Sequence, residues 1–253
     1  MASIHNNFRQ RLLEKQLLVG TFQKTPAMMI SEVLAKTNLD IVCLDAEHSP
    51  FDRKDIDACI LAFRSEQKPS IVRPASGAPE QILNALDCGA TGILVPHIDS
   101  VEKAKTLAKI SRYGDGGRGY AGSTRAALYT GRNIEENIEH NKNENTVIAQ
   151  IEDLAALEVI DEIAQVEGID GLFIGMADLT VSLGCRSLKD EPVINAAKHI
   201  CKAAKSANRA VGIFVGDMND IPFWQEQGVS LFLLNSEHGF IKQGANTLLD
   251  NFK

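Results

Sequence analysis

The chain has 253 residues, of which 44% are hydrophobic and 23% are charged. This balance is typical of a globular domain and excludes a disordered tail protein, which would contain fewer apolar residues. The 26 lysines and arginines are outnumbered by 33 aspartates and glutamates, so the net charge is −7. We therefore expect no nucleic-acid partner, because proteins that bind nucleic acids present a basic face.

The amino-terminal stretch is interrupted by charged side chains at Arg9, Arg11, Glu14 and Lys15, which is not the pattern of a secretory signal. No apolar run approaches the length of about 18 residues that a membrane helix needs, so we expect no membrane partner. The five cysteines are scattered and form no CxxC pair, which favours neither a disulfide framework nor a thiolate zinc site. The simplest interpretation is a cytoplasmic protein with reduced thiols.

Eight short apolar runs alternate with helix-like stretches along the chain. Several runs are apolar on both faces, as strands buried in a parallel sheet are. The runs are Leu17–Phe22, Ile41–Leu44, Ser70–Val72, Gly92–Val95, Val147–Ile151, Gly171–Ile174, Ala210–Val215 and Ser230–Leu234. Such strict alternation predicts an α/β protein with a (β/α)8 barrel, with no domain boundary within residues 1–253.

The stretches between the runs have the spacing of amphipathic helices. Helices are predicted over Pro79–Cys88, Leu154–Val166 and Pro192–Ala207, with a short one over Phe223–Gln227. The gap between the fourth and fifth runs holds a glycine-rich segment, 113–122, and an asparagine-rich segment, 133–145, which we expect to be a solvated helix and loop. The glycines at 114–119 do not form a P-loop, because no Gly-Lys-Ser/Thr follows them.

Side chains that carry chemistry follow most of the predicted strands. In a βα barrel the loops after the strands form the catalytic face. The candidates at these positions are Lys24, Asp45, Glu47, His48, Arg73, His97, Glu152, Asp178 and His238. We therefore expect carboxylates, histidines and an arginine to converge at one end of the barrel.

Glu152 and Asp178 follow neighbouring strands, and their oxygens can hold a hard divalent cation such as Mg²⁺ or Mn²⁺. The alternative is that they cap the helices that begin there. Arg73 ends a buried strand and must be paired, because an isolated buried charge is costly. It can bind an anionic oxygen of a substrate, or it can form a structural ion pair inside the barrel.

Three histidines, His48, His97 and His238, compete for an acid–base role, although each can also be an ordinary loop residue. His48 has the richest setting because Asp45 and Glu47 lie beside it, and neighbouring carboxylates orient an imidazole and favour its protonated form. Lys24 directly follows a strand, and we expect it to be solvated. A metal-stabilised enolate is therefore favoured over a Schiff base.

In these residues and in the segments around them, the chain resembles the HpcH/HpaI family of metal-dependent pyruvate aldolases. The resemblance extends from about Leu18 to Phe252. The long block Val166–Gly184 is the most specific part of the resemblance. The other matching segments are 45–48 after the second strand, 72–74 after the third, 87–96 into the fourth, 118–119 and 150–152.

The resemblance implies a (β/α)8 barrel that assembles as a hexamer, a trimer of dimers with the final helix exchanged between subunits. It implies reversible cleavage of a 4-hydroxy-2-oxo acid to pyruvate and an aldehyde, with Mg²⁺, Mn²⁺ or Co²⁺ as the cation. It leaves the aldehyde open. A CoA-ester lyase of the citrate-lyase β type and a catalytically silent keto-acid-binding protein are the alternatives.

The resemblance also implies roles for residues in binding the metal and pyruvate. Glu152 and Asp178 match the metal ligands, and Arg73 matches the residue that holds the keto or enolate oxygen. Gln150 and the backbone at Ala177 and Asp178 would border the pyruvate.

The resemblance assigns the proton-transfer role to His48, with Asp87 as its carboxylate partner, and implies that Asp45 and Glu47 lie in the outer part of the site. Three places depart from the family pattern: Met176, His97 and the segment Asn235–Gly239. We expect His97, the loop after the eighth strand and the loop Arg118–Arg132 to influence the choice of aldehyde.

Overall fold

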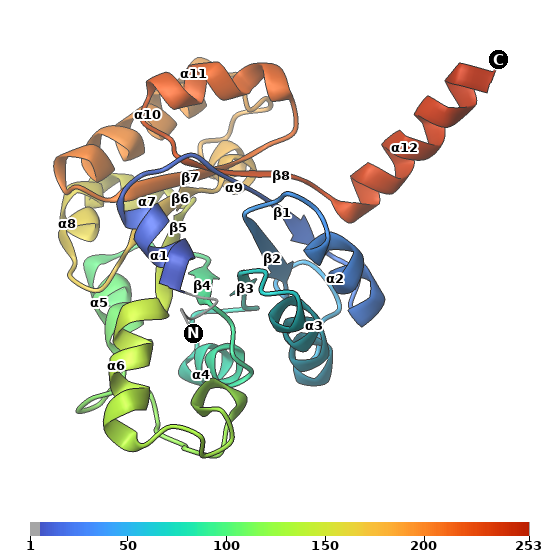
Figure 1. Cartoon of the computed structure of the whole chain (residues 1–253). Helices are drawn as coiled ribbons and strands as arrows, with labels where there is room; N and C mark the ends of the chain where they lie inside the picture. The colour runs from blue at the N-terminus through green and yellow to red at the C-terminus, as the bar shows by residue number, and fades with distance from the viewer. Residues whose placement is uncertain (1–5, 253) are drawn as a thin grey trace.

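The computed structural model describes residues 6–252, and eight parallel strands in it close into a barrel (Figure 1). Each strand pairs with its neighbours in chain order, and β8 pairs with β1. The strands are β1 (Leu18–Gln23), β2 (Ile41–Asp45), β3 (Ser70–Arg73), β4 (Gly92–Val95), β5 (Thr146–Ile151), β6 (Gly171–Ile174), β7 (Ala210–Val215) and β8 (Leu231–Ser236). The (β/α)8 barrel expected from the alternating pattern is confirmed, with strand ends shifted by one or two residues.

Helices lie outside the barrel, and those between consecutive strands return the chain from the carboxyl end of one strand to the amino end of the next. They are α1 (Asn6–Leu13), α2 (Met28–Ala35), α3 (Arg53–Ser65), α4 (Pro79–Asp87), α5 (Val101–Ile110), α6 (Ile134–Glu144), α7 (Leu154–Glu158), α8 (Ile160–Gln165), α9 (Met176–Ser182), α10 (Glu191–Ser206), α11 (Ile221–Glu226) and α12 (Glu237–Phe252). Two single-turn 3₁₀ helices cover Arg125–Ala127 and Met218–Asp220.

Two details differ from the sequence-based expectation. The helix expected over Leu154–Val166 is two helices, α7 and α8, which meet at Val159 with φ −126° and ψ 22°. The 133–145 segment begins at an Asn133–Glu136 capping box, as a helix should. It is not fully solvated, however, because Asn137, Asn141 and Glu144 are buried.

The apolar core has two layers. Strand side chains that point inward fill the barrel, and Phe8 and Leu12 of α1 join them. Strand side chains that point outward pack against the helices, where α10 contributes one of the largest faces with Val193, Ala197 and Ile200. This packing fixes the carboxyl ends of the strands, where the candidate site lies.

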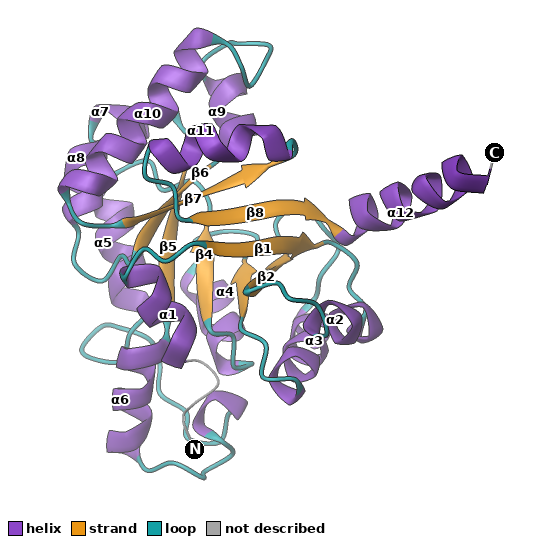
Figure 2. Cartoon of the chain, turned by 45° about the horizontal axis from the view of Figure 1, so that its top comes forward, coloured by secondary structure: helices purple, strands orange, loops and turns teal. Residues whose placement is uncertain are grey.

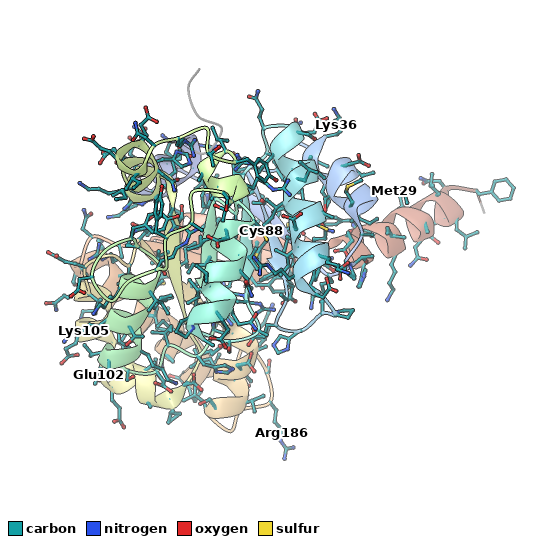
Figure 3. All side chains as sticks on the ribbon, turned by 90° about the horizontal axis from the view of Figure 1, so that it is seen from below. Met29, Lys36, Cys88, Glu102, Lys105 and Arg186 are labelled. Atoms are coloured by element: carbon teal, nitrogen blue, oxygen red, sulfur yellow. The ribbon has the colours of Figure 1, made fainter. Side chains whose placement is uncertain are left out.

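The last helix, α12, leaves the barrel after β8 and extends away from it (Figures 1 and 2). Its apolar side chains Ile241, Leu248 and Phe252 are exposed. On the barrel, α2 also exposes Met29 and Val33, and Met29 lies on the outer surface (Figure 3). Exchange of α12 between subunits remains a prediction. Within residues 6–252, no helix combines the length and apolar character needed to cross a membrane.

Candidate active site at the carboxyl ends of the strands

An arginine–aspartate pair lies at the carboxyl ends of β2 and β3. Asp45 is fully buried, and its Oδ1 accepts hydrogen bonds from Nε and Nη2 of Arg73 at 3.0 and 2.9 Å. The guanidinium also lies over the ring of Phe22, 4.7 Å from its centroid. Arg73 therefore forms the ion pair that its burial requires, and it also lines a pocket.

The carboxylate of Asp45 also contacts Lys24 and the backbone of His48. Its Oδ2 lies 3.0 Å from Nζ of Lys24, and its Oδ1 accepts the backbone N–H of His48 at 3.2 Å. Burial alone would raise the pKa of Asp45, but Arg73, the His48 amide and Lys24 outweigh burial and lower it. Asp45 is therefore ionised at neutral pH. Lys24, which we expected to be solvated, is instead paired with a buried carboxylate.

Glu47 connects the arginine to the histidines. Its Oε2 lies 3.2 Å from Nε of Arg73 and 3.6 Å from Nε2 of His48, and its Oε1 lies 3.7 Å from Nε2 of His97. Burial raises the pKa of Glu47, and Arg73 opposes that rise without cancelling it. Asp45 and Glu47 therefore both form ion pairs with Arg73, and both lie next to His48.

Glu152 lies at the centre of a group of possible metal ligands. Its side chain is 1% exposed, and ligand atoms of Glu47, His97 and Glu152 all lie within 4.8 Å of one another. Oε1 of Glu152 accepts the backbone N–H of His97 at 3.0 Å, and Oε2 accepts from Nε2 of Gln150 at 2.5 Å. Gly175 leaves room for this carboxylate, because a Cβ at that position would lie 2.4 Å from Oε2. Two carboxylates and an imidazole are suitable ligands for a divalent cation.

His97 adopts a left-handed backbone conformation with φ 56°, and its ring lies beside acidic residues. Nδ1 lies 3.1 Å from Oδ2 of Asp153 and 3.4 Å from Oε1 of Glu152. Burial lowers the pKa of His97, but the carboxylates of Asp153, Glu152 and Glu47 outweigh burial and raise it. Sequence reasoning singled out His97 as a departure but did not foresee its place beside Glu152.

Asp178 lies in the first turn of α9 and its side chain is exposed, outside the Glu47–His97–Glu152 group. Neither Glu152 nor Asp178 is a helix N-cap, since Gly175 precedes α9 and Asp153 precedes α7. The helix-cap alternative is therefore wrong. The pairing of Glu152 with Asp178 on one ion stays a prediction.

A pocket of about 430 Å³ opens at this end of the barrel. This size is within the range of small-molecule sites. Both polar and apolar residues line it: Phe22, Lys24, His48, Arg73, Gln150, Phe173, Ile174, Gly175, Met176, Ala177, Asp178, Leu188 and Phe214. Most of the residues predicted for catalysis and pyruvate binding therefore share one pocket.

Asp87 does not join this pocket. It is the last residue of α4, a helix that has already returned to the amino ends of the strands, and it forms an ion pair with Arg118. Within residues 6–252 the carboxylate in salt-bridge range of His48 is Glu47. The expected Asp87–His48 pair is thus not formed within this chain, and a role for Asp87 as partner of His48 stays a prediction.

Glu237 was missed by sequence reasoning. It is buried at the start of α12, and its carboxylate accepts the backbone N–H groups of Lys24 at 2.9 Å and Thr25 at 2.5 Å. His238 lies beside it, with Nε2 2.8 Å from Oγ1 of Thr25. The end of β8 therefore holds the loop after β1 in place.

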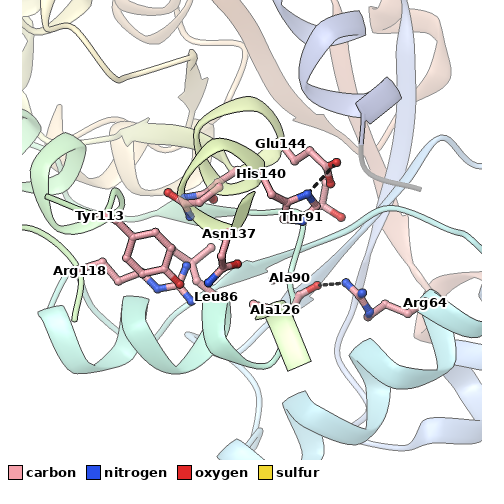
Figure 4. Close-up of a pocket in the computed structure, with 13 residues that line it drawn as sticks. Arg64, Leu86, Ala90, Thr91, Tyr113, Arg118, Ala126, Asn137, His140 and Glu144 are labelled. Atoms are coloured by element: carbon pink, nitrogen blue, oxygen red, sulfur yellow. Dashed lines mark hydrogen bonds and ion pairs between the residues drawn. The ribbon is translucent and has the colours of Figure 1, made fainter. Parts of the chain in front are cut away.

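A second cavity lies away from the strand ends, between α4 and α6 (Figure 4). Tyr113, Arg118 and Asn137 line it together with His140 and Glu144. Its volume of about 30 Å³ has room for one or two water molecules and not for a substrate. The pocket at the strand ends, by contrast, is large enough for a small-molecule substrate.

A closed (β/α)8 barrel with buried acids, an arginine and histidines at its carboxyl end defines an enzyme of the βα-barrel class. The family model described as HpcH/HpaI aldolase/citrate lyase matches residues 19–237. The chain therefore belongs to this family, as the resemblance implied.

Two of its relatives are named aldolases. A hydroxypyruvate/pyruvate aldolase of Pseudomonas aeruginosa is 29% identical over 98% of this chain and 93% of that protein. A 5-keto-4-deoxy-D-glucarate aldolase of Escherichia coli is 30% identical over 98% of this chain and 97% of that protein. The crystal structure of an HpcH/HpaI aldolase/citrate lyase family protein from Burkholderia cenocepacia matches this structure with a TM-score of 0.92 and 30% sequence identity. The match covers 98% of this chain and 99% of that chain. This chain is an enzyme of the same class, a carbon–carbon lyase.

Proposed function

We propose that this enzyme reversibly cleaves a 4-hydroxy-2-oxo acid into pyruvate and an aldehyde. The observation that carries the proposal is the pocket at the strand ends, which brings Arg73, His48 and Asp178 together beside the buried Glu152. The names of the relatives from Pseudomonas aeruginosa and Escherichia coli support the same reaction class.

The proposed cofactor is a divalent cation, Mg²⁺, Mn²⁺ or Co²⁺, held by Glu152 and Asp178, with Glu47 and His97 close to Glu152. A buried carboxylate such as Glu152 is costly without a compensating charge, which fits a cation at this place. The amide oxygen of Gln150 is buried without a hydrogen-bond partner, which fits a site completed by water or substrate. When bound, the cation supplies Lewis-acid stabilisation of negative charge on the C2 oxygen.

Arg73 is proposed to stabilise the enolate. Breaking the C3–C4 bond leaves its electron pair on C3, and the charge spreads to the C2 oxygen. A guanidinium that Asp45 already orients donates hydrogen bonds to that oxygen without rearranging during the reaction. Gln150 and the backbone at Ala177 and Asp178 border the pyruvyl part of the substrate.

His48 is proposed as the acid–base group. In the cleavage direction it accepts the proton of the C4 hydroxyl while C4 becomes the aldehyde carbonyl, and in the synthetic direction it returns that proton. Transfer of this proton from His48 to C3, directly or through water, then yields pyruvate and restores the neutral imidazole. The carboxylate of Glu47 lies 3.6 Å from Nε2 of His48 and faces the ring that carries the proton.

We also propose a homohexamer in which α12 packs on a neighbouring subunit. The exposed apolar side chains of α12 and the exposed Met29 and Val33 of α2 support this assembly, because apolar faces of this kind are usually covered. The five free cysteines, four of them buried, support the cytoplasm as the compartment.

Pyruvate release from a racemic 4-hydroxy-2-oxo acid tests the proposed reaction. We expect turnover by the wild-type enzyme and its loss in Glu152→Gln. Binding of the acid without any turnover would favour a keto-acid-binding protein. Turnover of a CoA ester in place of the hydroxy-oxo acid would favour the citrate-lyase type of chemistry.

A further inference from the structure

We propose that Lys24 binds a carboxylate on the aldehyde half of the substrate, so that the enzyme selects acidic aldehydes. This inference rests on the proposed function and names the substrate class that the same pocket accepts. Four observations carry it: the position of Lys24 in the barrel, the way its loop is held, its free donors, and the charge of the pocket wall.

Lys24 reaches the pocket from the side opposite Glu152. In a closed barrel of eight strands in chain order, β1 and β5 lie across from each other. Lys24 directly follows β1, and Glu152 directly follows β5. Since Lys24 and Asp178 line the same pocket, a substrate whose pyruvyl half lies near Gln150 and Asp178 extends its other half toward Lys24.

The loop that carries Lys24 is held firmly. Its backbone N–H is bound by the buried carboxylate of Glu237. Gln23, which is fully buried, donates from Nε2 to the carbonyl of Thr25 at 2.8 Å and accepts at Oε1 from Oγ of Ser31 at 2.8 Å. The loop that carries the ammonium group is therefore fixed by hydrogen bonds to buried side chains.

The ammonium group of Lys24 has more N–H donors than its ion pair with Asp45 requires. It carries three N–H groups, and it forms an ion pair with Asp45, whose Oδ2 lies 3.0 Å away. Asp45 is shared with Arg73, so a single buried carboxylate lies between two cations. The side chain of Lys24 is one-third exposed, and it lines the pocket, where a substrate oxygen can reach it.

The other cationic residues that line the pocket already have roles in the proposed reaction, so Lys24 is the residue that can bind a distal carboxylate. Among the residues lining this pocket in the described structure, Lys24, Arg73 and His48 are those that can carry positive charge. Arg73 and His48 act on the C2 oxygen and the C4 hydroxyl in the proposed reaction. Phe22 and Phe214, whose ring centroids are 6.0 Å apart, offer an acidic aldehyde apolar contact but no counter-charge.

The test compares two aldehydes of similar size with pyruvate in the synthetic direction: succinic semialdehyde, which carries a carboxylate, and 4-oxopentanal, which does not. The readout is the ratio of the two kcat/KM values, so that a general loss of activity cancels. We expect the wild-type enzyme to prefer succinic semialdehyde and Lys24→Met to lower the ratio about 10- to 100-fold, as loss of a charged hydrogen bond does. Lys24→Arg should keep most of the preference.

Lys36→Met is the matched control, because Lys36 pairs with Glu66 on the outer surface (Figure 3), and its ratio should equal that of the wild type. An unchanged ratio in a folded Lys24→Met enzyme would overturn the inference while leaving the proposed reaction standing. Covalent trapping of pyruvate on Lys24 by borohydride would overturn it as well, by giving the lysine a different role. Consumption of neither aldehyde, together with no pyruvate release from a racemic 4-hydroxy-2-oxo acid, would contradict the proposed reaction itself.

Discussion

Asp45 and Arg73 occupy paired register positions at the ends of β2 and β3, and two nitrogens of the arginine donate to one oxygen of the aspartate. The second oxygen of Asp45 faces Lys24. One buried carboxylate therefore orients the two cations that the proposals assign to opposite halves of the substrate. Its position follows from strand pairing, so the barrel itself sets the geometry of the charged wall.

Arg73→Ala should abolish most of the catalysis and also weaken the fold. Removing a group that stabilises an oxyanion typically lowers kcat about 10²- to 10³-fold. Asp45 would keep Lys24 as a partner, so we expect a loss of stability smaller than the about 3–5 kcal/mol typical of a broken buried pair. Steady-state kinetics and thermal unfolding measure the two effects. Near-normal kcat together with a lower Tm would show that Arg73 is only a structural ion pair.

Asp45 should make the fold more sensitive to acid. Its pKa in the folded protein lies below the ordinary value of 3.8, so its stabilising contribution is present above that value and is lost as pH falls through the folded pKa. Unfolding free energies measured between pH about 6 and 3 should therefore fall less steeply in Asp45→Asn than in the wild type. Parallel profiles for the two proteins would show that Asp45 gains no net stabilisation from Arg73 and Lys24.

His48→Ala should separate two reactions of the same pocket. General acid–base catalysis is worth about 10²- to 10⁴-fold, so aldol cleavage should fall by that order. Decarboxylation of oxaloacetate forms the same enolate but has no C4 hydroxyl to deprotonate, so it should fall far less. His97→Ala and His238→Ala serve as comparisons and should chiefly change KM or the preferred aldehyde. If His97→Ala shows the selective loss of aldol cleavage, the proton-transfer role belongs to His97.

Gly175→Ala should weaken metal binding. The added methyl carbon would lie 2.4 Å from Oε2 of Glu152, so the carboxylate must move. Gly216→Ala is a matched control after β7, because a Cβ there meets nothing within 4 Å. Calorimetric titration with Mn²⁺ should give a higher Kd for Gly175→Ala and an unchanged Kd for Gly216→Ala. Equal affinities in all three proteins would place the ion away from Glu152.

Much of the fold could be predicted from local pattern. Strands such as Ile41–Asp45 are apolar on both faces because they are covered on both sides, and that signal lies within a few residues. The break between α7 and α8 at Val159 has no comparable signal. The apolar spacing of that region continues across it, so periodicity alone predicted one helix.

The site was harder because its geometry depends on residues far apart in the chain. Lys24 is held by Glu237, more than 200 positions away, and no local pattern indicates that contact. Asp87 lies next to a recognisable motif, but its place at the end of α4 points it to Arg118. Arg73, the last residue of β3, and Glu152, which directly follows β5, lie at the end of the barrel where the pattern predicted them, because the barrel brings strand ends together.

The most direct test of the central claim is the metal dependence of pyruvate release. The enzyme is depleted of metal by exhaustive chelation, assayed with a 4-hydroxy-2-oxo acid, and assayed again after Mg²⁺, Mn²⁺ or Co²⁺ is returned. The account predicts that chelation abolishes turnover and that at least one of these ions restores it in the wild type but not in Glu152→Gln. Full activity of the metal-free enzyme would contradict it.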